Sequence, residues 1–342
     1  DRQLLCLGLL LRAISRIEDR VVREQLLCLF SSTLEFNNLF CSFKGEGTGA
    51  VRHMFSNHIL KPERTPLENS VWGTGRSSGT FASLFESRLL RAKRYLNEPF
   101  EVRLEADLFG GKARSSKFIA SAPMRPLLAE DWKGLVAETH SAALVLNGNS
   151  AALPLPDNVV DAVITDPPYF DFVHYSELSD FFFAWLAPVL KEQYSFFTRD
   201  DSSADGEVQD KDPSTFARHL GLVFSECRRV LKDEGVLAFS FHHSRPEGWA
   251  AIYQALANAG LTVVTAHPVH AELRAASPKT GTKDPISLDA ILVCRKQAAV
   301  HPKPYSVIDI LAETAAHSHT LRNGGLSLSR GDLFVIAAAH SL

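Results

Sequence analysis

The chain has 342 residues, of which 45% are hydrophobic and 22% are charged, and its formal net charge is −3. This composition describes a neutral soluble protein with ample apolar material for one large or two ordinary domains. It excludes a protein that is drawn to nucleic acid by its overall charge, so any such binding needs local basic faces. The apolar stretch Leu4–Leu11 is only about eight residues long, too short for a membrane span.

The cysteines and the two adjacent histidines argue against a metal site. No two cysteines form a Cys-x-x-Cys pair, and His242 and His243 would point to opposite faces of a strand. We therefore predict no bound metal, histidines near the rim of a cleft, and a cytoplasmic protein whose reduced thiols lie in its core. The five cysteines are Cys6, Cys28, Cys41, Cys227 and Cys294.

Residues 1–140 are predicted to be mainly helical. Apolar spacing indicates two helices over residues 3–36, a short helix over residues 51–59 and another over residues 81–96. Strands are expected within residues 101–126. Candidate basic faces for nucleic acid are Arg88, Arg91, Lys93 and Arg94 on one helix, Lys61 and Arg64 in a loop, and Arg274, Lys279 and Lys283 before the last strand.

The most informative segment is an apolar, β-branched run, Val159–Thr165, that leads directly into Asp166-Pro167-Pro168-Tyr169. The run predicts a strand, and the two prolines predict a stiff turn at its carboxyl end. A carboxylate and a backbone carbonyl at this position can accept both hydrogens of an amine. The aromatic ring of Tyr169 can stack on a flat partner.

The Asp-Pro-Pro-Tyr motif and the aromatic-acidic run after it resemble the amino-methyltransferases, and in particular the large adenine-specific DNA methylases. The resemblance implies that a methyl group passes from S-adenosylmethionine to an exocyclic amine of a base. Asp166 and the carbonyl of Pro167 would hold that amine, and Pro168 would stiffen the turn. Asp166 would also lie at the end of the pocket that contacts the methionine part of the cofactor. Tyr169 would stack on a flipped-out base, a contact worth ~1–3 kcal/mol. The resemblance also gives Phe170, His174 and Tyr175 as lining of the base pocket.

A helix is predicted to follow, capped by Ser176 or Ser179, with its aromatic residues in the protein core. Asp180 is expected to cap or to hydrogen-bond within the fold. The polar segment 193–213 has no periodicity, and we interpret it as a loop over the substrate cleft.

Downstream, residues 227–241 predict a helix, a glycine turn and a strand. A second helix over residues 249–259, ended by Gly260, precedes strands over residues 261–269 and 289–295. This order is similar to the second half of the methyltransferase sheet, in which the last strand inserts antiparallel.

We therefore expect an α/β fold with a Rossmann-like S-adenosylmethionine-dependent methyltransferase sheet, either whole or as its second half only. The catalytic core would span residues 141–297. It would follow a helical insertion or accessory region over residues 1–140 and precede a helical tail over residues 298–342, in which Ser327 or Ser329 opens the last helix.

The sequence matches the cofactor-binding motifs of this family only in part. Gly45 and Gly47 lie in a glycine-rich run that would let the backbone approach S-adenosylmethionine, although a run of this kind is also common in ordinary loops. Asn149 stands where the family often has an aspartate that binds the adenine of the cofactor, and an amide oxygen can still accept a hydrogen bond. Because the chain opens at Asp1, without methionine, a further expectation is that an upstream segment or a partner completes the cofactor site.

The resemblance implies an enzyme that methylates adenine N6 in DNA. Cytosine N4 methylation in DNA and guanine N2 methylation in RNA remain open, since related motifs serve both. A different class also remains open, a catalytically incomplete nucleic-acid-binding fragment or subunit. The expected partner is DNA in preference to RNA, and no membrane is expected.

Overall fold

The computed structural model describes residues 2–43, 51–56, 60, 62, 67–74, 77–105, 114–119, 126–168, 175–271, 286–297 and 306–342. The chain divides into two compact units. Unit 1 comprises residues 1–145 and 176–202, and unit 2 comprises residues 146–175 and 203–342. The helix that follows the Asp-Pro-Pro-Tyr segment therefore belongs to unit 1, whereas the strand before that segment belongs to unit 2.

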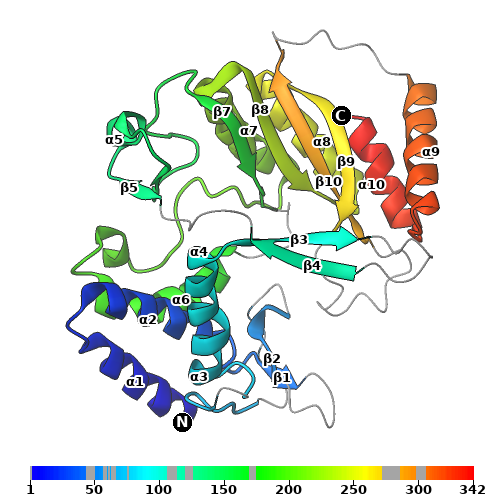
Figure 1. The fold of residues 1–342 in the computed structure, drawn as a ribbon. Helices are drawn as coiled ribbons and strands as arrows, with labels where there is room; N and C mark the ends of the chain where they lie inside the picture. The colour runs from blue at the N-terminus through cyan, green and yellow to red at the C-terminus, as the bar shows by residue number, and fades with distance from the viewer. Residues whose placement is uncertain are drawn as a thin grey trace. The chain divides into compact units, whose positions relative to one another are not determined.

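Unit 2 is built on a four-stranded sheet with the order β7-β8-β10-β9 (Figure 1). Its strands are β7 (Val160–Thr165), β8 (Leu231–Phe241), β9 (Leu261–His270) and β10 (Leu288–Lys296). β7 and β8 are parallel, whereas β10 runs antiparallel to both of its neighbours. The prediction of an α/β fold is confirmed, and so is the antiparallel insertion of the last strand.

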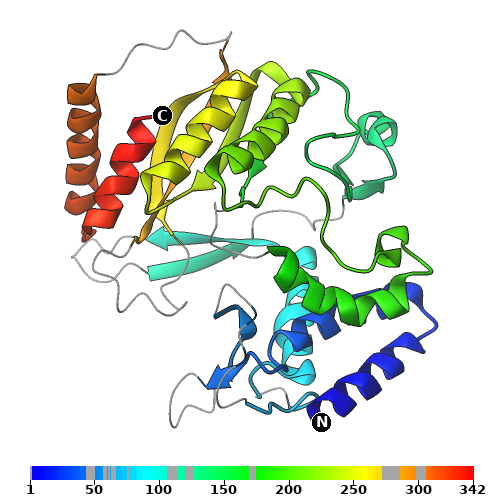
Figure 2. The ribbon, with the colours of Figure 1, turned by 180° about the vertical axis from the view of Figure 1, so that it is seen from behind.

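Helices α7 (Pro213–Val230) and α8 (Pro246–Ala259) lie side by side across one face of this sheet (Figure 2). Asp212 starts α7, because its side chain accepts a hydrogen bond from the backbone N–H of Thr215 at 2.8 Å. Gly260 ends α8 in the left-handed conformation at φ 67°, as predicted.

Alternate residues of the strands form two different faces. On the covered face, which packs against α7 and α8, Leu237, Phe239 and Phe241 of β8 are at most 1% exposed. The other face, here called the open face, is less buried, and its Ile164 is 83% exposed. The open face comprises Ile164 of β7, Ala238 and Ser240 of β8, and Ile291 and Val293 of β10.

The predicted glycine turn lies within β8. The register between β7 and β8 shifts there, from Val160 opposite Leu231 to Ala162 opposite Val236. A Cβ on Gly235 would come within 2.9 Å of the carbonyl oxygen of Lys232. The tight turn therefore needs glycine for lack of space.

The carboxyl-terminal helices complete unit 2. α10 (Arg330–His340) packs against the sheet at β10 and β9, and α9 (Val307–Asn323) packs against α10. Ser329 caps α10 in a capping box with Asp332, as the sequence predicted for one of two serines. Asp332 is buried and also accepts a hydrogen bond from the backbone N–H of Ser287 at 2.7 Å, which ties α10 to the start of β10.

Unit 1 is mainly helical. It contains α1 (Arg2–Ser15), α2 (Arg20–Leu34), a long helix over residues 81–97, and α6 (Tyr175–Leu190). The long helix has α-helical ends, α3 (Phe81–Leu84) and α4 (Arg91–Asn97), around a π-helical segment over residues 85–90. The apolar sides of these helices form a second core.

The aromatic residues of α6 and Asp180 agree with the sequence predictions, whereas the caps do not. Phe181, Phe182 and Trp185 pack against the core of unit 1, which confirms their predicted role. The predicted caps are wrong, because α6 begins at Tyr175 and both Ser176 and Ser179 lie inside it. Asp180, in contrast, bonds within the fold, accepting from the N–H and the hydroxyl of Ser202 at 2.7 and 2.6 Å.

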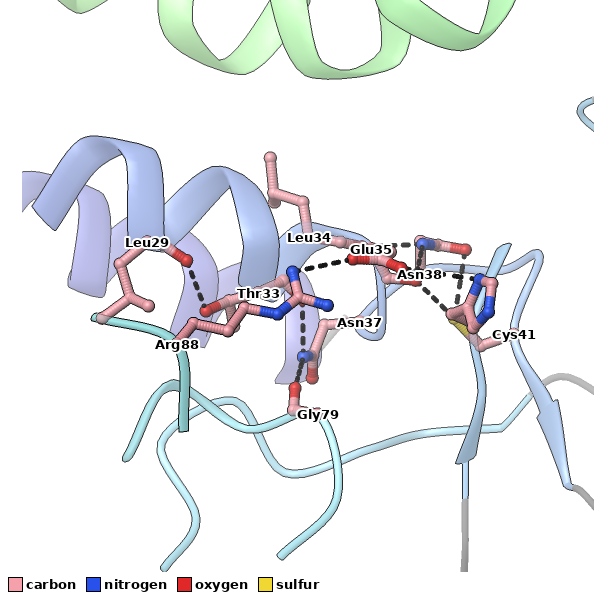
Figure 3. A network of polar contacts seen from close by, with 10 residues as sticks. Leu29, Thr33, Leu34, Glu35, Asn37, Asn38, Cys41, Gly79 and Arg88 are labelled. Atoms are coloured by element: carbon pink, nitrogen blue, oxygen red, sulfur yellow. Dashed lines mark hydrogen bonds and ion pairs between the residues drawn. The ribbon is translucent and has the colours of Figure 1, made fainter. Parts of the chain in front are cut away.

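A buried polar network secures the end of α2 (Figure 3). Asn37 donates from its side chain to the carbonyl oxygens of Thr33 and Gly79, at 2.8 and 3.0 Å, and Asn38 donates to that of Leu34 at 2.7 Å. The carbonyls of Thr33 and Leu34 need such partners because the last turn of a helix leaves its carbonyl oxygens without their regular intrahelical donors. The network therefore has a structural role.

Two further residues of the same region are engaged structurally. Glu35 accepts a hydrogen bond from Arg88 at 3.1 Å, so Arg88 is already paired. Burial raises the pKa of the Cys41 thiol to about 11, so this cysteine is uncharged at neutral pH. The prediction that the thiols lie in the core holds for Cys41, Cys227 and Cys294 but is wrong for Cys6 and Cys28, which are exposed on α1 and α2.

Short strands complete the description of unit 1. They are β1 (Ser42–Phe43) with β2 (Val51–Arg52), β3 (Phe100–Glu105) with β4 (Arg114–Ile119), and β5 (Leu127–Ala129) with β6 (Ala142–Leu144), beside α5 (Trp132–Ala137). The strands expected within residues 101–126 are confirmed. The helix expected over residues 51–59 is wrong where the structure describes it, since β2 is followed only by a 3-10 turn, Met54–Ser56. Within the described parts of the chain, no helix is both long and apolar enough to cross a membrane.

Candidate functional site

The structure describes only part of the site that the sequence predicts. Asp166, Pro167, Pro168, Asn149 and Tyr175 are among the described residues. The remaining predicted site residues lie outside the described residues; these are Tyr169, Phe170, His174, Gly45 and Gly47.

Asp166 lies immediately beyond the carboxyl end of β7. The register pairs Thr165 of β7 with Phe239 of β8. The residues that follow these two along the chain, Asp166 and Ser240, therefore lie beside one another. Asp166 is exposed, whereas Pro167 after it is buried. The strand end thus presents a carboxylate to solvent from a backbone that two consecutive prolines make stiff.

Ser240 holds the carboxylate of Asp166. Its hydroxyl donates a hydrogen bond to Oδ1 of Asp166 with an O···O distance of 2.5 Å. That is the short end of the range for a hydroxyl bonded to a charged carboxylate, about 2.5–2.7 Å, in which the bond is stronger than a neutral one.

A second polar pair, His242 and Asp289, lies next along the same side of the sheet. Nδ1 of His242 is hydrogen-bonded to Oδ1 of Asp289, which is a buried residue of β10. A carboxylate can only accept, so Nδ1 carries the hydrogen and the pair fixes the tautomer of the ring. His242 follows the carboxyl end of β8, whereas His243 is completely buried, so the prediction of a rim position is wrong for His243. Among the described residues there is no group of three or more side chains suited to a metal ion.

The segment before β7 is fastened to α7 by Arg229. Its guanidinium donates to the carbonyl oxygens of Leu153 and Leu155, at 3.1 and 2.8 Å, and forms an ion pair with Asp157 at 2.5 Å. Glu226 binds the same guanidinium, and that hydrogen bond holds the pKa of Glu226 below its ordinary value. The segment that leads into β7 is therefore fixed on the helix that covers the sheet.

Asn149 and Tyr175 make contacts of other kinds. The side-chain oxygen of Asn149 accepts the backbone N–H of Ala151 at 2.9 Å, within a local turn. The backbone N–H of Tyr175 donates to Oε1 of Gln209 at 3.3 Å. Neither contact reaches Asp166.

Ser240 is not among the site residues that the sequence predicts. A usable signal was present, because Ser240 is the one polar residue in Leu237–Phe241, an otherwise apolar run at the end of a strand. The missing information was the register that sets this residue beside Asp166.

Three cations on α4 are candidates for contact with nucleic acid. Arg91, Lys93 and Arg94 are exposed. Beyond the helix, the ammonium group of Lys117 lies 4.2 Å from the ring centroid of Phe100, a cation–π contact. The other candidates apart from Arg88 lie outside the described residues; these are Lys61, Arg64, Arg274, Lys279 and Lys283.

The chain was compared with protein families, curated proteins and solved structures. No protein-family model matches the sequence, and no curated protein matches it either. Among solved structures, the chain is similar to one described as a SAM-dependent methyltransferase from Methanosarcina mazei. The identity is 12%, the likeness covers 49% of this chain and 80% of the other, and the TM-score is 0.23. A likeness of that size carries no weight for the function.

Proposed function

We propose that this chain carries the base-binding and catalytic side of an S-adenosylmethionine-dependent methyltransferase that acts on adenine N6 in DNA. The observation that carries the proposal is the carboxylate of Asp166. It is exposed at the carboxyl end of a parallel strand, in an Asp-Pro-Pro segment that the two prolines stiffen, and it is held by Ser240. The order of the sheet, with one antiparallel strand between β8 and β9, supports the same family of folds.

The chemistry explains why such a carboxylate is needed. An exocyclic amine on a base is a poor nucleophile, because its lone pair is delocalised into the ring. In the proposal, Asp166 and the carbonyl oxygen of Pro167 accept the two N–H hydrogens, which localises the lone pair on nitrogen. Fixed acceptors of this kind stabilise the transition state without reorganising during the reaction. Tyr169 would stack on the extruded base.

S-adenosylmethionine is the proposed methyl donor, but the described residues do not by themselves form a site for it. The amide oxygen of Asn149 is engaged by Ala151, and Gly45 and Gly47 lie outside the described residues. Among the described strands, β7 pairs only with β8, so its other edge carries no strand there. The described residues can bind the amine that accepts the methyl group. A partner or a further segment is proposed to complete the binding site for the cofactor.

Substitution of Asp166 tests the proposal. Asp166→Ala in the full-length protein should leave the fold intact and abolish methyl transfer, because losing one transition-state contact costs ~2.7–4 kcal/mol, or about 100- to 1000-fold in rate. Transfer of tritiated methyl groups to DNA is the measurement, with circular dichroism as the control for folding. An Asp166→Ala protein that keeps more than about a tenth of the activity contradicts this role.

Cofactor binding separates this proposal from the second class, an incomplete nucleic-acid-binding fragment or subunit. We expect the 342-residue chain alone to bind S-adenosylmethionine weakly or not at all, because polar groups of a buried ligand left unpaired each cost ~1–3 kcal/mol. Isothermal titration calorimetry measures this binding. Low-micromolar affinity that is lost in Gly45→Val or Gly47→Val would contradict the expectation and show that the glycine run is the cofactor loop.

The partner belongs to the proposal as well. Arg91, Lys93 and Arg94 on α4 would neutralise phosphates of DNA, which gives local attraction in a chain whose overall charge is slightly negative. The free cysteines support a location in the cytoplasm, where thiols stay reduced.

A further inference from the structure

The contact between Ser240 and Asp166 joins a rigid donor to a side chain at the end of an edge strand. Ser240 stands between Phe239 and Phe241, both of which are buried in the core against α7 and α8. Across the sheet it is paired with Ile291 of β10. The backbone of Ser240 is therefore fixed from three sides, and its short side chain has a single heavy-atom torsion to order.

Within the part of the chain that the structure describes, Asp166 has no comparable support of its own. Its side chain is exposed and follows a strand that has one strand neighbour among the described residues. Among the described residues, the hydrogen bond from Ser240, at 2.5 Å, is the side-chain contact that fixes the direction of this carboxylate.

The bond also distinguishes the two carboxyl oxygens of Asp166. The hydroxyl of Ser240 donates to Oδ1. Oδ2 is then free of that contact and can accept an N–H from a substrate. An acceptor held in one direction is what the amine of a base requires, since the hydrogen must be met along the N–H bond.

We propose that Ser240 is a positioning residue for Asp166. It fixes Oδ1, so that Oδ2 meets the exocyclic amine in one orientation. The inference rests on the proposed function and adds a residue that acts through the carboxylate without touching the substrate.

The test compares Ser240→Ala with Ser240→Thr in the full-length protein, with DNA as substrate. Ser240→Ala should lower kcat for methyl transfer by roughly 10- to 100-fold, the loss expected when a reacting group is misplaced by about 1 Å, and leave KM for DNA nearly unchanged. Ser240→Thr keeps the hydroxyl and should recover most of kcat. Ser225→Ala is the matched control and should keep full activity, because it removes a hydroxyl that donates within its own helix to the carbonyl oxygen of Gly221.

Asp166→Ala in the same assay distinguishes a failure of the positioning role from a failure of the proposed function. If Asp166→Ala is inactive and Ser240→Ala keeps the wild-type kcat, the positioning role is overturned and the proposed function stands. If Asp166→Ala is active, the proposed function fails and the inference falls with it.

A second readout needs no turnover. In a crystal structure of Ser240→Ala, the carboxylate of Asp166 should take more than one conformation or a new one. An unchanged, single conformation of Asp166 would overturn the inference even if the activity were altered.

Discussion

The two faces of the sheet in unit 2 are made from alternate residues of the same strands, yet their surroundings differ sharply. On the covered face, Phe239 of β8 and Leu292 of β10 are almost completely buried. On the open face, Ile164 is 83% exposed, although it belongs to an apolar run of the kind found in strands that are buried on both sides. The hydrogen-bonded pairs Asp166–Ser240 and His242–Asp289 lie along the open face.

This difference separates the residues that hold the fold from those that carry the proposed chemistry. Packing against α7 and α8 stabilises the sheet through the covered face. The open face contributes less burial, so its polar residues can be present for reasons other than stability. Substitutions on the two faces should therefore have different consequences, and this expectation can be tested from the largest effect downward.

The largest loss of stability is expected for Phe239→Ala. The ring lies in the covered face and contacts Phe224 of α7, with ring centroids 5.2 Å apart. Removing a buried phenylalanine leaves a cavity and costs ~3–5 kcal/mol. The free energy of unfolding, measured with urea, should fall by this amount. A loss under about 1 kcal/mol would mean that the covered face does not hold the sheet.

The next effect is expected at Asp332, which fixes the start of β10. Burial raises the pKa of this carboxyl, but hydrogen bonds from Ser287 and Ser329 outweigh it, so the folded-state pKa lies below the ordinary value. Its stabilisation is therefore present above the unfolded pKa, near 3.9, and is lost as the pH falls through the folded value.

Asp332→Asn tests that linkage. At pH 7 the variant should lose ~1–3 kcal/mol, because buried N–H donors lose their charged acceptor. Urea unfolding between pH 2 and pH 7 should also show a flatter fall of stability in acid than the wild type shows. A variant that matches the wild-type slope below pH 4 would contradict the role of this carboxylate.

Much of unit 2 could be predicted from sequence, because the relevant signals are local. The apolar spacing before Gly260 and the left-handed conformation that glycine allows together define the end of α8. The prediction of a helix over residues 51–59 is wrong for a non-local reason. Met54 is buried and its N–H bonds to the carbonyl oxygen of Glu35, so contact with α2 determines the conformation, and a helix of that length is marginal alone.

The candidate site was predictable only where one segment carries it. Asp166 follows an apolar strand and precedes two prolines, and that pattern is visible in a single stretch of sequence. The partnership with Ser240 depends on the register of two strands that are distant in the sequence. That register includes a shift at the turn of Gly235, which no local pattern specifies.

The smallest effect is expected for Ile164→Ala on the open face. The side chain of Ile164 is largely in water in this structure, so its removal exposes little new apolar surface and leaves no cavity. The free energy of unfolding should change by less than ~0.5 kcal/mol, as for exposed positions in general. Val163→Ala is the matched control on the same strand, because Val163 packs against the core and should cost more. A loss above about 1 kcal/mol in Ile164→Ala would show that the open face is covered in solution. Repeating the measurement over a tenfold range of protein concentration would then decide between a second copy as the cover, for which the loss depends on concentration, and a segment of the same chain, for which it does not.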